Sequence, residues 1–396
     1  MSITKITENV YSVGVINPSL RIFDIIMEAK YGTSYNAYLV TGEKNILIDT
    51  VHHDFFDEYI YNVQCLIDIE SIDYLIVNHT ELDHSGSISK LLEINPKIKI
   101  VCTVPASKYL KNIINKDFEF ITVRDGDNLK VGQNELEFIV KPFLHWPDTM
   151  MTYVKSESVL FPCDFLGCHF CEPTAFDYNI KYKKEYLEQF KYYYDGIFGP
   201  FKPYVMDGIN KLKDLKLSYV CPSHGPVLTD SINDRIDDYE KWSQPELDNK
   251  KNLLIIYASA YGCTKKLAEA AAEKVREDGK VDVEIIDVVT NPIDDVANKI
   301  AKASALLVGS CTINRDAPKV IWDVLSRIDA INTRKKVAGC FGSYGWSGEA
   351  VKLIKERLSG IGYKVIDGEV KANFMPNNDD LNYIKEYALK LISEIK

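Results

Sequence analysis

The sequence predicts an α/β protein of two domains: an N-terminal sandwich of sheets flanked by helices, and a C-terminal doubly wound parallel sheet. Three observations lead to this prediction. The chain has 396 residues, which is more than one average domain contains. Before about residue 250, short β-rich runs alternate with turns, and after it apolar strands alternate regularly with amphipathic helices. We therefore expect domains at residues 1–248 and 249–396, joined by a polar, helix-leaning linker at residues 237–252.

The N-terminal half contains several strand-like runs separated by turns rich in Gly, Asn and Asp. Helical patterns lie between some of them, at residues 85–94 and 181–194. Sheets covered by helices are the arrangement that buries both kinds of element. The expected strands lie within residues 36–50, 72–80, 97–104, 136–143, 158–164 and 217–225.

The C-terminal half repeats a β-α unit five times, which predicts a parallel sheet with helices on both faces. The expected strands lie at residues 253–259, 282–288, 305–310, 335–343 and 363–369. The expected helices lie at residues 264–278, 293–302, 318–328, 348–358 and 380–395.

The composition excludes some classes of partner. The formal charge of −10 and the pI of about 5.3 argue against nucleic acid, because phosphate binding needs a basic face. No apolar run approaches the roughly 20 residues of a membrane helix, and the first residues lack a signal-peptide pattern. Nine scattered cysteines indicate reduced thiols. We expect a cytoplasmic protein with neither a membrane nor a nucleic acid as partner.

Two histidines and two acids are packed into "HTELDH", directly after an apolar strand. Imidazole and carboxylate are the usual ligands of first-row divalent metals where thiolate is absent. Further histidines and an aspartate stand at the ends of other strands, where α/β folds place their sites. A polar loop is the alternative, but so many such residues at strand ends favour a pair of metals. The candidate ligands are His79, Glu81, Asp83, His84, His145, Asp164 and His224.

Three loops of the C-terminal half combine Gly, small hydroxyl residues and aromatic residues. The first turns directly into a helix, whose N-terminal N–H groups can hold a phosphate. The others follow the third and fourth strands, and they flank the crevice where this fold binds ligands. Tyr and Trp there can stack on a flat ring, so the loops suit flavin mononucleotide. The candidate residues are Ser259, Ala260, Tyr261, Gly262, Cys263, Thr264, Ser310, Thr312, Asn314, Ser343, Tyr344, Gly345 and Trp346.

The histidine motif resembles that of the metallo-β-lactamase superfamily, H-x-H-x-D-H followed by a distant His, an Asp and a last His. Glu81 stands where that superfamily usually has its second His, and a hard anionic oxygen favours iron or manganese over zinc. With flavodoxin-like loops behind it, the pattern resembles the flavodiiron proteins, or A-type flavoproteins. The resemblance implies FMN and two iron ions. It assigns one iron to His79, Glu81 and His145, and the other to Asp83, His84 and His224, with Asp164 as the bridge.

The resemblance also implies an activity and partners. We expect an oxidoreductase that reduces O2 to water with four electrons, with reduction of NO to N2O as the alternative on the same site. No rubredoxin-like pair of C-x-x-C motifs follows the second domain, so the donor is expected to be a separate rubredoxin or a similar protein. The family implies a head-to-tail homodimer, or a homotetramer, in which the flavin of one chain faces the irons of the other.

Some positions depart from the family or leave alternatives open. Many members have a histidine shortly before "GTTYNAY", and in this chain Asp24 or Ile25 takes its place. Cys263 stands where a Ser is more usual. A metallo-hydrolase and a simple electron-transfer flavoprotein are the alternative functions. The segment "CDFLGCHFC", with Cys163, Cys168, Cys171 and His169, is expected to be structural rather than redox-active.

Overall fold

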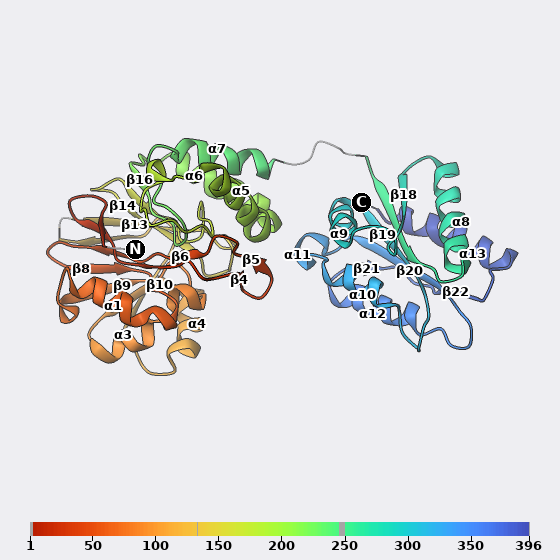
Figure 1. The fold of residues 1–396 in the computed structure, drawn as a ribbon, viewed down its shortest axis with the longest axis horizontal. Helices are drawn as coiled ribbons and strands as arrows, with labels where there is room; N and C mark the ends of the chain where they lie inside the picture. The colour runs from red at the N-terminus through yellow and green to blue at the C-terminus, as the bar shows by residue number, and fades with distance from the viewer. Residues whose placement is uncertain (1–2, 133, 245–249, 396) are drawn as a thin grey trace. The chain divides into compact units, whose positions relative to one another are not determined.

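In the computed structural model, residues 3–132, 134–244 and 250–395 are described, and they form two units with separate hydrophobic cores (Figure 1). The chain divides into Met1–Pro245 and Glu246–Lys396. The domain boundary expected between residues 248 and 249 lies outside the described residues.

Two sheets form the centre of the first unit. The strand order of the first sheet is β1-β2-β7-β8-β9-β10-β11, and that of the second is β12-β13-β14-β15-β16. The first sheet consists of β1 (Thr4–Lys5), β2 (Val10–Ser12), β7 (Tyr38–Val40), β8 (Asn45–Ile48), β9 (Ile72–Ile76), β10 (Lys99–Thr103) and β11 (Phe120–Val123). The second consists of β12 (Asn128–Val131), β13 (Asn134–Val140), β14 (Met150–Val154), β15 (Val159–Phe161) and β16 (Tyr219–Val220).

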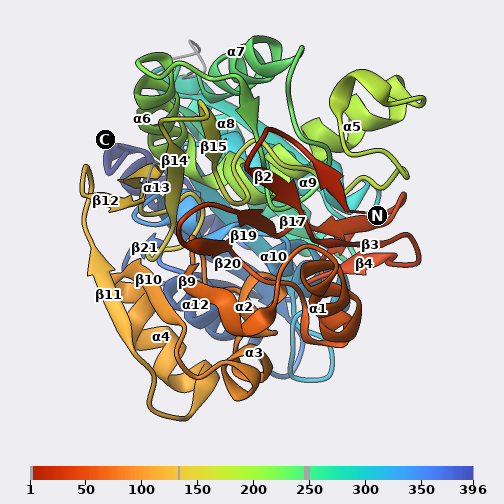
Figure 2. The same cartoon turned by 90° about the vertical axis from the view of Figure 1, so that its left-hand side faces the viewer.

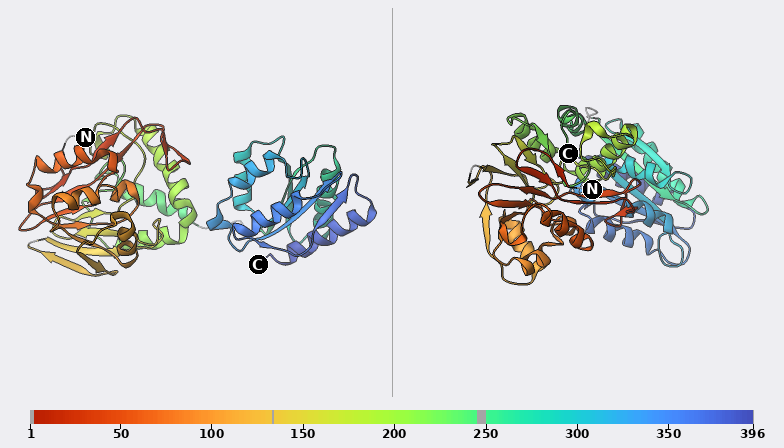
Figure 3. Two further views of the ribbon diagram at one scale, coloured as in Figure 1. Left: turned by 90° about the horizontal axis from the view of Figure 1, so that it is seen from below. Right: turned by 60° about the vertical axis from the view of Figure 1, so that its left-hand side comes forward.

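Helices cover both outer faces, so the first unit has four layers (Figures 2 and 3). The first sheet is covered by α1 (Phe56–Gln64), α3 (Ile88–Ile94) and α4 (Val104–Ile114), and α2 (Leu82–Ser85) follows β9. The second sheet is covered by α5 (Lys183–Tyr193), α6 (Lys202–Lys213) and α7 (Ile232–Ser243).

Alternation along the strands explains the layers. On β8, the side chain of Leu47 packs in the core with α1, α3 and α4, whereas Ile46 and Ile48 pack between the two sheets. Successive residues of a strand point to opposite faces, so a strand that is apolar at every position is buried on both sides. The predicted sandwich of sheets flanked by helices is therefore confirmed.

Two short hairpins complete the first unit. One pairs β3 (Val15–Asn17) with β6 (Thr33–Tyr35), and the other pairs β4 (Ile22–Phe23) with β5 (Met27–Glu28). The tip of the second hairpin is apolar but exposed: Ile25 is 92% and Ile26 is 87% exposed.

The first part of the expected linker is wrong. Residues 237–243 belong to α7, which is helical to Ser243. The side chain of Tyr239 is fully buried and Trp242 packs against the same core. The polar residues on the outer face of α7 hid this apolar stripe in the sequence pattern.

The second unit is built on one sheet with the strand order β18-β17-β19-β20-β21, and β22 also pairs with β20. Every strand pair in it is parallel, which confirms the doubly wound sheet. The strands are β17 (Asn252–Ala258), β18 (Asp282–Asp287), β19 (Ala305–Cys311), β20 (Val337–Tyr344), β21 (Lys364–Val365) and β22 (Val370–Asn373).

Helices pack on both faces of this sheet. One face carries α8 (Cys263–Asp278) and α13 (Asn378–Ser393), and the other carries α9 (Ile293–Lys302), α10 (Lys319–Ser326) and α12 (Ala350–Gly360), with α11 (Ala330–Thr333) following α10. Ile255 and Ile256 of β17 point to opposite cores.

The fifth predicted strand, residues 363–369, is wrong as a single element. β21 pairs with the beginning of β20, and β22 pairs with its end. Between them, Gly368 has φ = +121°, a conformation open to glycine and strained for other residues. The break lets the chain leave the sheet and return to the same neighbouring strand.

Among the described residues, no helix is both long enough and apolar enough to cross a membrane.

Candidate functional site

The seven candidate metal ligands come together in the first unit, where strands of both sheets end. His79 and Glu81 follow β9, and Asp83 and His84 lie on α2. The other three residues come from the second sheet, after β13, β15 and β16, and they are His145, Asp164 and His224. Segments far apart in sequence therefore meet at one place.

The first group of ligand atoms surrounds one carboxylate oxygen of Glu81. Nε2 of His79 lies 3.2 Å and Nε2 of His145 lies 3.3 Å from Oε2 of Glu81. Oδ2 of Asp164 lies 4.0 Å from Nε2 of His79 and 3.5 Å from Nε2 of His145. One ligand atom from each of these four residues lies within 4.8 Å of all the others.

The second group faces the other oxygen of Asp164. Nε2 of His84 lies 3.2 Å and Nε2 of His224 lies 3.4 Å from Oδ1 of Asp164. Asp83 completes the group, with Oδ1 3.3 Å from Nε2 of His84 and Oδ2 3.0 Å from Nε2 of His224. Asp164 thus places one oxygen toward each group, which is the geometry of a carboxylate between two metal ions.

The ligand atoms of the site fit a pair of metal ions rather than a network of ordinary ion pairs. Both carboxylate oxygens of Asp83 are buried and lack a well-oriented hydrogen-bond donor among the described residues, although Nε2 of His224 is 3.0 Å away. Both ring nitrogens of His84 are likewise buried and have no well-oriented hydrogen-bond partner among the described residues. Buried polar atoms without partners are rare in folded proteins. Imidazole and carboxylate ligands suit iron, so the residues present fit two iron ions.

Electrostatics at the site follow from burial and from opposite charges at short range. Burial by itself raises the pKa of Asp164, but the facing histidines hold that pKa well below its ordinary value. Burial by itself lowers the pKa of His224, but Asp164 and Asp83 raise it to about 10. The pKa values of His79, His84 and His145 are raised in the same way. Metal ions would replace the protons that these rings otherwise hold.

A second layer of hydrogen bonds orients the ligands. Nδ1 of His79 lies 3.2 Å from Oδ2 of Asp148, which also accepts from the N–H and hydroxyl of Thr80 at 2.9 and 2.8 Å. Nδ1 of His224 donates to the carbonyl of Ser34 at 2.6 Å. Each bond fixes the tautomer and leaves Nε2 free to face a metal.

Sequence reasoning missed residues that support the motif. Asp49 accepts from the backbone N–H of Asn78 at 2.8 Å and so holds the residue before His79. Tyr193 is buried, and its hydroxyl donates to Oδ1 of Asp164 at 3.0 Å. Asp49 ends "ILID" and Asp148 lies in "HWPD". A carboxylate shortly after an expected strand was therefore the sequence signal that could have identified these two supporting residues. Tyr193 sits in a tyrosine-rich helix that gave no such signal.

Several other histidines, cysteines and acids of the first unit lie outside the proposed ligand set. Sγ of Cys163 lies with ligand atoms of His84 and Asp164 in one group within 4.8 Å, whereas Cys168 and Cys171 are not in any such group among the described residues. His52, His53 and Asp54 form a separate group that is partly exposed. The β4–β5 hairpin lies near the centre, because the ring of Phe23 in β4 is 5.9 Å from that of His224. The pKa of Asp24, next to Phe23, is raised by burial and by the negative charges of Glu81 and Asp83.

The first flavin loop in the second unit ends at the start of α8. Gly262 has φ = +81° and precedes the helix without a side-chain cap. The first N–H groups of a helix have no partner within it. One of these N–H groups, that of Lys265, donates to the hydroxyl of Ser259 at 3.2 Å. The exposed turn therefore fits a phosphate group.

The structure links the three predicted flavin loops to one another. The hydroxyls of Thr264 and Ser343 lie 2.7 Å apart, and the N–H of Thr312 donates to the carbonyl of Ser343 at 3.0 Å. Thr264 and Ser343 are buried, and their hydroxyls join the first and third loops. The hydroxyl of Ser310 is also buried, but it donates to the carbonyl of the adjacent Cys311 at 2.8 Å. Asn314 has φ = +51° in the second loop.

Exposed aromatic rings stand around these loops. Tyr261 is 91% and Trp346 is 77% exposed, and nearby Phe374 is 65% exposed. Phe374 lies against the third loop, because its N–H donates to the carbonyl of Tyr344 at 2.8 Å. Large exposed rings beside a phosphate-binding turn fit the flat ring system of a flavin. The sequence pattern did not single out Phe374, which follows β22.

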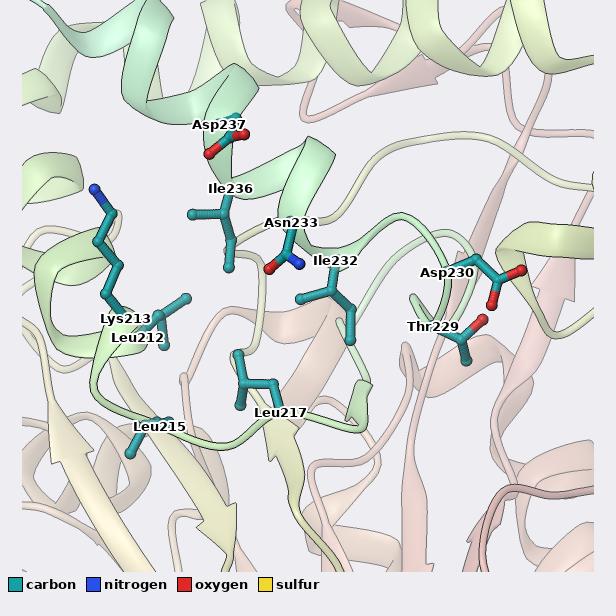
Figure 4. Close-up of a pocket in the computed structure, with 10 residues that line it drawn as sticks. All are labelled: Leu212, Lys213, Leu215, Leu217, Thr229, Asp230, Ile232, Asn233, Ile236 and Asp237. Atoms are coloured by element: carbon teal, nitrogen blue, oxygen red, sulfur yellow. The ribbon is translucent and has the colours of Figure 1, made fainter.

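A cavity of about 520 Å³ lies elsewhere in the first unit, between the end of α6 and the start of α7 (Figure 4). Its walls are Leu212, Lys213, Leu215, Leu217, Thr229, Asp230, Ile232, Asn233, Ile236 and Asp237. None of the candidate ligands lines it, so it is separate from the metal centre.

The comparisons with known proteins agree for both units. Residues 33–225 match the model of the ODP family beta lactamase, and residues 255–386 match that of flavodoxin. The flavo-diiron protein FprA2 of Clostridium acetobutylicum is 45% identical over 386 residues, which cover 96% of each chain. The anaerobic nitric oxide reductase flavorubredoxin of Aliivibrio fischeri is 34% identical over 90% of this chain and 72% of its own.

Among solved structures, the rubredoxin oxygen:oxidoreductase from Desulfovibrio gigas is similar over the whole chain. Its TM-score is 0.68 at 29% sequence identity, and the match covers 100% of this chain and 98% of that one.

Proposed function

Because the chain belongs to the flavodiiron protein family, we propose that it reduces O2 to water with electrons delivered through FMN. Membership follows from 45% identity over 96% of both chains, and it confirms the family resemblance drawn from the sequence. The chain is accordingly an oxidoreductase with FMN and two iron ions as cofactors.

One observation carries the proposal for the site: Asp164 directs its two oxygens toward two groups of ligands, one of which contains Glu81. We propose the ligand set that the family resemblance implied. One iron is held by His79, Glu81 and His145, the other by Asp83, His84 and His224, and Asp164 bridges them.

When bound, the two irons supply a place for a diatomic molecule and two of the four electrons that O2 requires. The chain supplies the surroundings. Asp148 keeps the ring of His79 in one orientation. Burial raises the pKa of Tyr193 well above its ordinary value, so its hydroxyl keeps its proton and donates it to Asp164 in a hydrogen bond. The ligands themselves are mostly buried, which limits access of bulk water.

For the flavin, we propose that the turn at Gly262 and the start of α8 bind the phosphate. Tyr344, Gly345 and Trp346 would border the ring system. The remaining candidates of these loops complete the site, and they are Ser259, Ala260, Tyr261, Cys263, Thr264, Ser310, Thr312, Asn314 and Ser343. The exposed rings and the linked loops support this assignment.

We further propose a rubredoxin or a similar small redox protein as the donor, and a head-to-tail homodimer or homotetramer as the assembly. The rubredoxin oxygen:oxidoreductase of Desulfovibrio gigas supports the donor by its name. Two exposed apolar surfaces support the assembly: the hairpin tip at Ile25 and Ile26 in the first unit, and the flavin-loop aromatics in the second. The nine cysteines are free, in keeping with the cytoplasm as the proposed location.

Reduction of NO to N2O is a second candidate function, because a relative at 34% identity is named an anaerobic nitric oxide reductase. The same ligands would serve both reactions. The family resemblance puts Asp24 or Ile25 where many members have a histidine, and we propose that the β4–β5 hairpin influences the choice between O2 and NO.

The test is anaerobic stopped-flow with the fully reduced protein, mixed with O2 in one run and with NO in another. Fast flavin reoxidation by O2, with water and little peroxide as product, is the expected result. Turnover with NO alone would replace the oxygen assignment by the nitric oxide one. Slow reoxidation in both runs, with peroxide formed, would reject both.

A variant separates catalysis from plain electron transfer. Asp164→Asn keeps the size of the bridge but removes its charge, and we expect O2 reduction to water to be lost. The flavin should still accept electrons from the donor. The exposed His53 offers a matched control, since His53→Asn changes a histidine outside the ligand groups around Asp164. Unchanged O2 reduction in Asp164→Asn would favour a simple electron carrier.

A further inference from the structure

His169 is a buried imidazole that the proposed ligand set does not use. It lies in the segment after β15 and is 2% exposed. Its Nε2 atom has no hydrogen-bond partner among the described residues. A buried nitrogen without a partner costs free energy, so a purely structural role would be served better by an apolar ring of the same size.

The ring of His169 is packed against two groups of the metal centre. Its centroid lies 4.7 Å from that of His224, and the two rings are edge to face. It lies 4.9 Å from the ring of Tyr193, also edge to face, and 4.2 Å from that of Phe23. His169 therefore contacts both a candidate ligand and the tyrosine that donates to Asp164.

The hydroxyl of Thr33 connects His169 to His224. Its oxygen lies 2.9 Å from Nδ1 of His169 and 3.4 Å from Nδ1 of His224. It also lies 3.2 Å from the carbonyl of Ser34, the group that accepts from Nδ1 of His224 at 2.6 Å. The hydroxyl of Thr33 thus lies near three polar atoms: Nδ1 of His169, Nδ1 of His224 and the carbonyl oxygen of Ser34.

Two arrangements of the protons are compatible with these distances. Thr33 can donate to Nδ1 of His169 and accept weakly from His224. Alternatively, His169 donates to Thr33, which donates in turn to the carbonyl of Ser34. In both arrangements Nδ1 of His169 holds the hydroxyl of Thr33, so the backbone at Thr33 and Ser34 stays where the Nδ1–H of His224 needs its acceptor.

We infer that His169 and Thr33 act together as positioning residues for His224, fixing the ring so that its Nε2 faces the second iron. The inference rests on the proposed ligand set and goes beyond it, because it assigns a function to a histidine of the segment that the sequence pattern marked as structural. Groups that hold a metal-ligating histidine in place commonly change metal affinity by about 10- to 100-fold when they are removed.

Substitutions can separate the two nitrogens of His169. An asparagine amide reaches the place of Nδ1, whereas a glutamine amide reaches the place of Nε2. His169→Asn should therefore preserve the bond to Thr33, and His169→Gln and His169→Phe should lose it. Thr33→Ser keeps the hydroxyl and Thr33→Val removes it with little change in shape. This pair therefore tests the same hydrogen bond by changing its other partner.

The experiment measures iron retention in the full-length protein, without turnover. Each variant is loaded with two irons anaerobically, and release of ferrous iron to ferrozine is followed in time. We expect His169→Phe, His169→Gln and Thr33→Val to release one of the two irons about 10- to 100-fold faster, while His169→Asn and Thr33→Ser stay close to the unchanged protein. The double variant His169→Phe/Thr33→Val should be no worse than either single one, because both act through one bond.

Other outcomes would overturn the inference. Retention restored by Gln rather than Asn would assign the effect to Nε2, and additive losses in the double variant would separate the two residues. Thermal midpoints of the metal-free variants test plain packing: iron loss that follows these midpoints, and not the retained nitrogen, would mean that His169 only fills space. Since no turnover is measured, failure to reduce O2 or NO would reject the proposed function and leave this result intact.

Discussion

Glu81 is the residue at which the metal motif departs from a zinc-type site. Its Oε2 lies within 3.3 Å of Nε2 of both His79 and His145, so one carboxylate oxygen stands where a neutral ring would otherwise be. Glu81→His should shift the metal preference toward zinc. We expect metal analysis to find less iron after purification in mixed metals, with O2 reduction lowered at least about 100-fold. An unchanged iron content would refute this role of the carboxylate.

Asp148 provides a second test on a single residue, on the side of His79. Replacing it by Asn leaves the size nearly unchanged but removes the charge that faces Nδ1 of His79. Iron in the Glu81 group should be held about 10- to 100-fold more weakly. Equilibrium competition with a ferrous chelator measures the loss, and Asp54→Asn, an exposed aspartate, is the control. Equal affinity in the Asp148 variant would show that Thr80 alone orients the loop.

The histidines also predict a dependence of metal binding on pH. In the metal-free chain the pKa of His224 is raised to about 10, above its unfolded value of about 6.5. The protonated ring therefore stabilises the metal-free fold fully below about 6.5, and this contribution is lost as the pH rises through about 10. A metal must displace the proton, so affinity should rise with pH up to that range. Calorimetry with Co²⁺ at pH 8 in two buffers should show proton release, and heats that are independent of the buffer would contradict it.

At the scale of elements, the strands and helices of the second unit were predictable because each strand is apolar and each helix is amphipathic. The split of residues 363–369 was missed, although Asp367 and Gly368 form a turn signal inside the expected strand. The helix α7 was taken for a linker because its outer face is polar, and only the packing of Tyr239 and Trp242 shows its inner face.

The same reasoning explains which parts of the site were predictable. His79 to His84 are close in sequence and chemically distinctive, so they drew attention without a structure. Asp148, Tyr193 and His169 act through contacts between segments that are distant in the chain. Such contacts depend on how the two sheets meet, which no local pattern contains.

The turn before α8 allows a test at this scale. Gly262 has φ = +81°, and a Cβ there would meet nothing within 4 Å. Gly262→Ala should therefore cost about 1–2 kcal/mol through backbone conformation alone, and it should weaken FMN binding by reshaping the loop. Gly360, at the end of α12, also has free space but no positive φ, so Gly360→Ala is the control. Thermal midpoints and FMN titration check both, and equal effects of the two changes would contradict the explanation.

At the scale of the whole molecule, the two units have separate cores and separate cofactors. We expect calorimetry of the cofactor-free protein to show two unfolding transitions. Because a ligand stabilises only the state that binds it, FMN should raise the transition of the second unit and metal ions that of the first. A single transition that both ligands raise together would show that the units unfold as one.

The fluorescence of Trp146 can report metal binding in the first unit. Its indole lies 5.0 Å from the ring of His79 and 6.2 Å from that of His145. The chain has only four tryptophans, and Trp346 lies in the third flavin loop of the second unit. Iron at the centre would quench the emission of Trp146, and bound flavin that of Trp346. Filling of each cofactor site can thus be followed by the colour and lifetime of native fluorescence, without a dye or a label, in the same sample and during assembly.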